Sequence, residues 1–172
     1  MDGWEIRVRR YASETVNGQV VYRRAPRWLS PHVLGYSGWQ VDMTLPIQRR
    51  LVPFGGVSVL LDFVPPIRES VLGVRHRFHF PVAGMHDGPI VFRQAGRHFG
   101  VGVGLTPAGA YALFGTPMHE LTNAVVELSD LIGNRAEQLT ERLAQAPSWP
   151  ARFALLNDSP AQMDSGRPCA AG

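Results

Sequence analysis

The stretch Phe99-Gly-Val-Gly-Val-Gly-Leu105, followed by Thr106-Pro107, divides the chain into two parts of different secondary structure. Apolar residues alternate with glycine as far as Leu105, which is the two-residue period of a β-strand. Thr106 then suits a helix N-cap, and Pro107 suits the first helical position. The sequence before this point predicts β-structure, and the sequence after it predicts helices.

The first part of the chain reads as about eight short strands separated by Gly or Pro, a spacing typical of a barrel or a sandwich. Asn17-Gly18 predicts a two-residue hairpin turn between strands over 4–16 and 19–23. Further strands are predicted over 34–43, 49–54, 57–64, 71–80, 89–93 and 97–105.

The second part of the chain carries repeated helix signals. Gly115 suits a helix end, and Thr116-Pro117 repeats the start seen at 106–107. The longest predicted helix, 129–144, places apolar residues at intervals of 4, 3 and 4, which forms a single stripe: Ile132, Ala136, Leu139 and Leu143. A last helix follows from Ser148.

Composition limits the class of protein. With 172 residues, 45% of them hydrophobic, the chain is long enough for one domain with its own core. All 17 basic residues are Arg, which indicates a GC-rich coding bias, and the net charge of +3 permits a polyanionic partner without requiring one. The single cysteine, Cys169, excludes an internal disulfide and a cysteine metal site.

No apolar run approaches the ~20 residues of a membrane span, and the N-terminus does not resemble a signal peptide. We therefore expect a cytoplasmic protein that has no membrane partner.

Two features of the strands call for an explanation. Gly100, Gly102 and Gly104 share one strand face, which leaves room for a helix or a ligand to approach the backbone, and helix packing is favoured. Asp62 lies inside the apolar run 57–64. An edge position or a hydrogen-bonded partner is favoured there over a catalytic base.

The residue patterns of known catalytic sites give little support to an enzymatic function. A cupin-like metalloenzyme using His76, His79 and His98 is an alternative, but the spacing of His76 and His79 puts them on opposite faces of a strand. No Ser or Cys has the context of a nucleophile. We expect no enzymatic activity, no metal and no cofactor.

DNA reading within the chain is also disfavoured. No Arg or Lys lies between Arg97 and Arg135, and the helix–Gly115–helix segment carries Glu120, Glu127 and Asp130. DNA would repel such a segment.

Three stretches together resemble the N-terminal sensor domain of AraC-type transcriptional regulators of an actinobacterial group. The first runs from Tyr22-Arg-Arg-Ala-Pro26 through Leu29-Ser-Pro-His-Val33 to Trp39. The second is Leu51-Val-Pro-Phe-Gly-Gly-Val-Ser-Val-Leu-Leu-Asp-Phe63. The third begins at Val101-Gly-Val-Gly-Leu-Thr-Pro107, passes through Leu113-Phe-Gly-Thr-Pro117, and ends with Arg152-Phe-Ala-Leu-Leu156.

The resemblance implies an α+β fold: a cupin-like antiparallel β-barrel followed by a C-terminal helical pair or bundle. It divides the chain into an N-terminal hairpin extension (1–21), a β-barrel sensor (22–105), a helical dimerisation or packing segment (106–157) and a linker (158–172). It further implies a small-molecule effector and a homodimer. DNA would be bound only through a C-terminal helix-turn-helix domain that lies outside this sequence.

Aromatic residues of the expected barrel are the candidate lining of an effector pocket, with His79, Arg93 or Gln94 as polar groups that orient the ligand. The predicted ligand-binding residues are Trp28, Tyr36, Trp39, Phe54, His79, Phe80, Phe92 and Arg93. The apolar stripe from Ile132 to Leu143 is expected either to pack on the barrel or to pair with its mate in a dimer.

The chain departs from the regulator pattern at two places. Phe54 stands where an acidic residue is common, and Gly104 stands where an arginine is usual. Both changes make the barrel less polar, which favours an apolar or aromatic effector, or none. A stand-alone protein that sequesters a small molecule is the second alternative.

Overall fold

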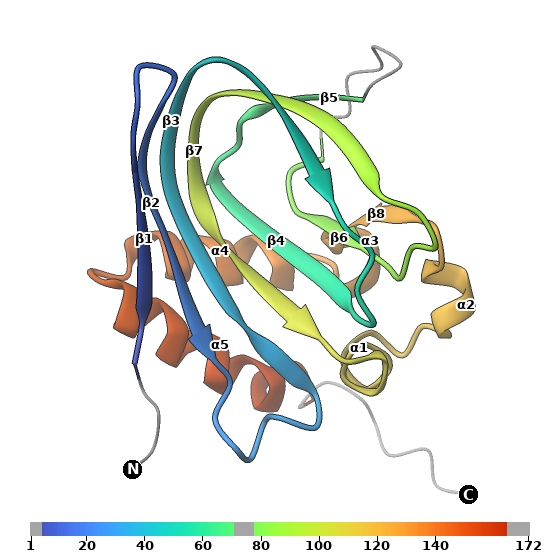
Figure 1. Cartoon of the computed structure of the whole chain (residues 1–172). Coiled ribbons are helices and arrows are strands. Elements are labelled where there is room, and N and C mark those ends of the chain that lie inside the picture. The colour runs from blue at the N-terminus through green and yellow to red at the C-terminus, as the bar shows by residue number, and fades with distance from the viewer. Residues whose placement is uncertain (1–4, 71–77, 165–172) are drawn as a thin grey trace, which may run out of the picture.

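Two long strands, β3 (Val33–Leu51) and β7 (Ile90–Leu105), form the centre of a curved antiparallel sheet (Figure 1). They pair along their whole length, from Val33 opposite Leu105 to Leu51 opposite Ile90. The computed structural model describes residues 5–70 and 78–164.

Shorter strands extend the sheet on both sides. β2 (Val16–Arg24) and β1 (Arg7–Ala12) follow β3, while β4 (Val57–Val64), β6 (Pro81–Ala83) and β8 (Val125–Glu127) follow β7. β5 (Ile67–Ser70) pairs with the first half of β7. Across the described residues β1 and β8 end the sheet without pairing to each other, so the sheet is open and the expected barrel closure is not seen.

The two central strands bend together over an irregularity in their pairing. The register slips between Met43 and Ile47 on β3, and Gly96 opposite has a φ of +84°, a conformation that glycine adopts without strain. Pro46 lies in this bulge, where a missing N–H breaks no ladder bond. The sequence predicted separate strands over 34–43 and 49–54, and over 89–93 and 97–105; each pair is instead one continuous bent strand.

The N-terminal hairpin turns earlier than predicted. Its turn is Ser13 to Thr15, closed by hydrogen bonds between Ser13 and Val16, and Asn17-Gly18 lies inside β2. A Cβ on Gly18 would lie 2.1 Å from the carbonyl oxygen of Gln40, so glycine permits the close approach of β3. The prediction of an Asn-Gly turn is wrong because a side-chain hydrogen bond fixes the turn four residues upstream.

The helices follow β7, as the change in sequence period predicted. α1 (Pro107–Phe114) has Thr106 as its N-cap, whose hydroxyl accepts from the N–H of Gly109 at 3.0 Å, and Gly115 ends it in the left-handed conformation. α2 (Met118–Leu121) follows.

Three details of the helical part differ from the prediction. Residues 125–127 form β8 against β6 rather than helix. The predicted helix 129–144 is split by Gly133, with a φ of +63°, into α3 (Leu128–Ile132) and α4 (Arg135–Gln145). α5 (Trp149–Asp164) then extends into the segment predicted as linker. The predicted strand 71–80 lies mostly outside the described residues.

The helices cover one face of the sheet and bury the main core between them. Leu61 and Val101 of the sheet belong to one apolar cluster with Leu143 of α4 and Phe153 of α5. The predicted stripe is part of this core: Ala136, Leu139 and Leu143 are buried and Ile132 packs beside them. Packing on the sheet is therefore the role that the structure shows for the stripe.

Candidate functional site on the inner face of the sheet

A second, smaller core lies on the face of the sheet opposite the helices. Trp39, Val41 and Met43 of β3 are its buried members, and Leu60 of β4 packs against them. Met43 is 2% exposed because side chains of the neighbouring strands enclose this core: Val16 and Val20 of β2, Ile47 of β3 and Leu60 of β4. We call this side the inner face. By the pairing register it also carries Asp62, Gln94, His98 and the glycines at 100, 102 and 104.

A connected group of polar side chains lies within the inner face, and we call it the inner polar cluster: Asp62 of β4, Arg68 of β5, and Gln94 and His98 of β7. Nη1 of Arg68 donates to Oδ2 of Asp62 at 2.6 Å, and Nε2 of His98 lies 2.7 Å from Oδ1 of the same carboxylate. The amide nitrogen of Gln94 lies 2.5 Å from Nδ1 of His98. The Asp62 side chain is 0% exposed, so this cluster is a buried charge network, in which each charge must be paired.

The hydrogen bonds fix the protonation of His98. Oδ1 of Asp62 only accepts, so Nε2 carries the proton, and Nδ1 accepts from the Gln94 amide. Burial lowers the pKa of His98. The hydrogen bond and negative charge of Asp62 act to raise this pKa, and the positive charges of Arg68 and Arg49 act to lower it. A neutral His98 leaves the Asp62–Arg68 pair balanced in charge.

Trp39 lies across the glycines of β7. A Cβ on Gly100 would approach Nε1 of Trp39 to 3.0 Å, and one on Gly102 would approach the same ring to 3.0 Å. The glycines thus make room for an indole from the neighbouring strand, and the helices pack on the opposite face. The sequence-based preference for a helix over these glycines is wrong, since β3 supplies the group that covers them.

The indole N–H of Trp39 is the unsatisfied donor of this site. Trp39 is 8% exposed, its ring centroid is 4.9 Å from that of His98, and Nε1 has no hydrogen-bond partner among residues 5–70 and 78–164. A buried donor without an acceptor costs about 1–3 kcal/mol, which a bound acceptor would recover.

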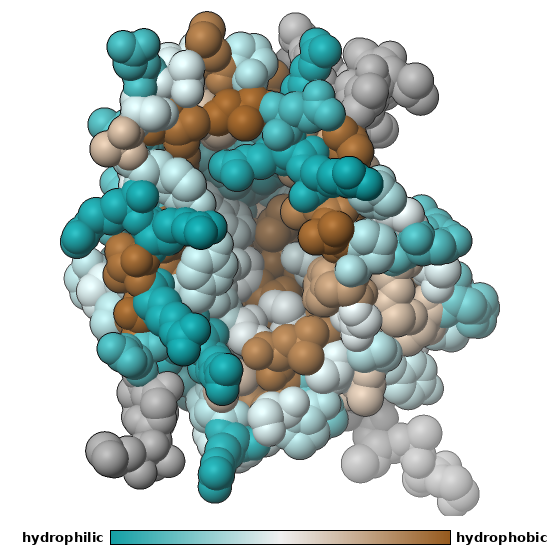
Figure 2. All heavy atoms as spheres, viewed as in Figure 1, coloured by the Kyte–Doolittle hydropathy of each residue, from teal (hydrophilic) through white to brown (hydrophobic). Residues whose placement is uncertain are grey.

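The molecule is hollowed beneath the arch of β3 and β7 (Figure 2). The hollow is open to the viewer and shows mainly apolar surface on its floor, with polar groups along its upper rim. By register, Ile47 and Arg49 of β3 and Phe92 of β7 belong to the inner face beside the polar cluster. An apolar recess with a few buried polar groups is the usual form of a small-molecule site.

A second candidate site is an apolar gap between the sheet and the helices. It has a volume of about 40 Å³, and Tyr36, Leu61, Leu128 and Leu139 are among its lining residues. The hydroxyl of Tyr36 has no partner within the described residues, and burial raises the pKa of Tyr36 to about 12 against the opposing charge of Arg23. The gap has room for a few waters and is too small for an aromatic ligand.

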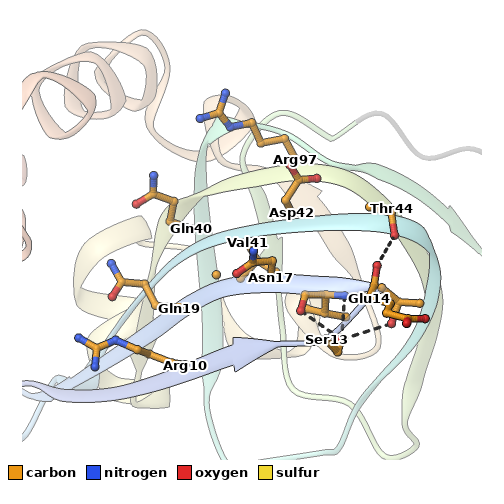
Figure 3. Close-up of a pocket in the computed structure, with 13 residues that line it drawn as sticks. Arg10, Ser13, Glu14, Asn17, Gln19, Gln40, Val41, Asp42, Thr44 and Arg97 are labelled. Carbon is orange, nitrogen blue, oxygen red and sulfur yellow. Dashed lines mark hydrogen bonds between the residues drawn. The ribbon is translucent and has the colours of Figure 1, made fainter.

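A third candidate is a polar groove of about 570 Å³ on the outer side of β1, β2 and β3 (Figure 3). Arg10, Gln19, Gln40 and Arg97 line it, and the hydrogen bonds drawn there close the turn around Ser13 and Glu14. Gln40 and Arg97 are exposed, so the groove is a hydrated sheet face rather than a built site. The inner face is the strongest candidate of the three.

The predicted ligand-binding residues are not brought together in one place. Trp39 and Phe92 lie on the inner face, while Tyr36 faces the helices and stacks on Phe153. Arg93 is exposed on the outer face, and Trp28 (64% exposed) lies in the turn before β3.

Three further residues of the prediction lie at the edges of the sheet. Phe54 is exposed near Gly56. The backbone N–H groups of His79 and Phe80 donate to Glu127 at 3.0 and 2.6 Å, where Phe80 packs on the main core and His79 is exposed.

The histidines of the metalloenzyme alternative are also separated. His98 is enclosed by Asp62, Gln94 and Trp39, His79 lies on an exposed loop, and His76 lies outside the described residues. In the described ranges no three His, Cys, Asp or Glu side chains come together in a group that would hold a metal ion.

Residues 25–127, more than half of the 172, match the family described as Domain of unknown function (DUF6597). The chain belongs to the DUF6597 family. Every member of the inner polar cluster and Trp39 lies within the DUF6597 match, whereas β1, α4 and α5 lie outside it. Searches of curated proteins and of solved structures gave no match to the chain.

The sequence predicted part of the inner polar cluster. It singled out Asp62 as a polar residue in an apolar strand and favoured a hydrogen-bonded partner, which the contacts with Arg68 and His98 confirm. It missed Arg68 and Arg49. Arg68 follows Pro65-Pro66 on a strand of four residues, which is too short for a two-residue period to identify.

Proposed function

We propose that this chain is the effector-sensing domain of an AraC-type transcriptional regulator, and that it binds a small apolar or aromatic molecule on the inner face. Domains of the DUF6597 family occur in AraC-type regulators. The β-then-α order and the sequence resemblance agree with that placement. In such regulators the sensor controls an attached helix-turn-helix reader of DNA.

The observation that carries the proposal is the unpaired indole N–H of Trp39 beside a buried polar cluster. Natural cores satisfy their buried donors, and exceptions concentrate where a ligand or water completes the site. The half-buried side chains of Ile47, Leu60 and Phe92 on the same face supply apolar contact area. A ligand with a flat or apolar body and one acceptor atom would satisfy both features.

Homodimerisation is part of the proposal, but on a surface other than the one expected from sequence. The stripe of α4 is buried against the sheet, so a partner would meet other residues. Native mass spectrometry tests this point: a mass of twice 19.0 kDa at micromolar concentration is expected, and a monomer throughout would contradict it.

Binding is tested by thermal unfolding of the full chain with phenol, indole, benzyl alcohol and phenylacetate as probes. We expect at least one probe to raise the midpoint temperature, and Trp39→Phe, which keeps a ring but removes the N–H, to reduce that shift. Trp28→Phe is the matched control, because Trp28 is 64% exposed. The proposal fails if no probe stabilises the chain, or if both substitutions reduce the shift equally.

A further inference from the structure

Among the described residues, Trp39 and the inner polar cluster carry more hydrogen-bond donors than acceptors. In the inner polar cluster Asp62 already accepts from both Arg68 and His98, and Nδ1 of His98 is taken by Gln94. Nη2 of Arg68 lies 3.3 Å from Nε2 of His98, but that nitrogen carries a hydrogen that points to Asp62. This contact therefore joins two donors, and the Nη2 hydrogens find no acceptor in it.

Arg49 adds a second positive charge to the same face. It pairs with Phe92 in the register of β3 and β7, is half-buried, and acts electrostatically on His98. Across the described residues it forms no ion pair and no side-chain hydrogen bond. Asp62 balances one of the two arginines, so Asp62, Arg68 and Arg49 leave a net charge of +1 beside a neutral His98.

The donors on the inner face favour a ligand of a definite chemistry. Within residues 5–70 and 78–164, the buried indole N–H of Trp39 has no acceptor, Nη2 of Arg68 meets only Nε2 of His98, and the half-buried guanidinium of Arg49 has no side-chain partner. A carboxylate has two oxygens that accept from several donors, and its single negative charge would bring the site to neutrality. The half-buried apolar side chains of Ile47, Leu60 and Phe92 on the same face would contact the remainder of such a ligand.

We infer that the inner face takes a small carboxylate with an aromatic or apolar body, held by Trp39, Arg68 and Arg49. The inference rests on the proposed function, since it names the class of effector for the same site. Charge complementarity would then supply selectivity: a neutral analogue leaves the guanidinium groups without an acceptor, which is a larger penalty than a change in apolar contact.

The experiment compares acid and amide pairs by isothermal titration of the full chain. Phenylacetate is compared with phenylacetamide, and 3-phenylpropionate with 3-phenylpropionamide; acetate tests for non-specific ionic binding. We expect each aromatic carboxylate to bind at least ~10-fold more tightly than its amide, and acetate to bind more weakly than either aromatic acid.

Two arginine substitutions separate a specific contact from a general charge effect. Arg49→Gln is expected to abolish the preference for carboxylate. Arg50→Gln, one residue later on the exposed outer face of the same strand, is expected to keep it. Trp39→Phe is expected to weaken the acid as well.

The possible results are distinguishable. Equal binding of acids and amides overturns the carboxylate inference while leaving the proposed sensor function in place. Equal losses in Arg49→Gln and Arg50→Gln also overturn it, because net charge alone would then explain the preference. If neither acids nor amides bind, the inference is wrong, and the sensor function is judged by the neutral probes phenol, indole and benzyl alcohol.

Discussion

His98 and Asp62 lie 2.7 Å apart, Nε2 to Oδ1, on the neighbouring strands β7 and β4. The contact joins a neutral imidazole to a fully buried carboxylate, and Arg68 closes the other side of that carboxylate at 2.6 Å. The arrangement holds three ionisable groups in one fixed geometry beneath the arch of the sheet. It therefore affects both the stability of the chain and the pH dependence of that stability.

Removal of Arg68 leaves the charge of Asp62 buried without its cation. We expect Arg68→Met to lower the free energy of unfolding by roughly 3 kcal/mol in urea denaturation, because an uncompensated buried charge is costly. The double substitution Arg68→Met with Asp62→Leu removes both charges and should recover much of the loss. Arg50→Met, on the exposed outer face, is the control and should cost at most ~0.5 kcal/mol. A small effect of Arg68→Met would contradict the buried ion pair.

Acid is expected to destabilise the chain through His98. Burial lowers its pKa in the folded state, so the unfolded chain takes up a proton that the folded chain resists. The contribution is complete above the unfolded pKa of about 6.5 and is lost as the pH falls toward the lower folded value. We expect the unfolding free energy to decrease from pH 7 to pH 5, and more steeply in the wild-type chain than in His98→Gln.

The exposed His119 provides the control for that pH experiment. His119→Gln should keep the steep wild-type slope. If His98→Gln and the wild-type chain instead have parallel profiles, the neutral state assigned to His98 is wrong.

The packing of Trp39 on β7 predicts a contrast between two glycines of one strand. A Cβ on Gly100 would lie 2.5 Å from the backbone oxygen of Leu61 and 3.0 Å from Trp39, so neither neighbour yields easily. Around Gly104 the nearest atom is 3.5 Å away, which is ordinary contact. We expect Gly100→Ala to cost about 2 kcal/mol or more and Gly104→Ala less than about 1 kcal/mol. Equal costs in urea denaturation would argue against this position of the indole.

Tyr36 carries a buried hydroxyl that has no hydrogen-bond partner in the part of the chain that the structure describes. Tyr36→Phe removes that unsatisfied group and keeps the ring on Phe153, so the free energy of unfolding should stay the same or rise. Tyr36→Leu loses the stacked ring and should cost about 2 kcal/mol or more. A loss above ~1 kcal/mol in Tyr36→Phe would reveal a hydrogen bond, for example to a water in the adjacent gap.

The local signals in the sequence identified both ends of α1 and the change from strands to helices after Leu105. Thr106, Pro107 and Gly115 act through short-range geometry, and each occupies the position that the sequence predicted. The local signal at Asn17-Gly18 predicted the wrong turn. The hydrogen bond between Ser13 and Val16 fixes the turn upstream, and Gly18 instead permits the close approach of β3.

The candidate site depends on contacts between distant parts of the chain. His98 meets Asp62 across 36 residues and Arg68 across 30, and nothing in the local pattern of either strand specifies that contact. The two-residue period already puts Tyr36 and Trp39, three residues apart, on opposite faces of β3, but it does not tell which of the two faces the helices cover. The bend between Met43 and Ile47 creates the inner face. It arises from a shift in the pairing of β3 with β7, so the sequence of β3 alone does not predict it.

The most direct measurement of the central claim is the indole N–H resonance of Trp39 in a ¹⁵N spectrum of the full chain. Trp39→Phe assigns the signal by its loss. On addition of saturating phenylacetate, a large downfield shift of the Trp39 proton is expected as the N–H gains an acceptor, while the signal of the exposed Trp28 stays in place. If the Trp39 signal is unmoved although phenylacetate binds, the ligand occupies another part of the molecule, and the inner face is not the effector site.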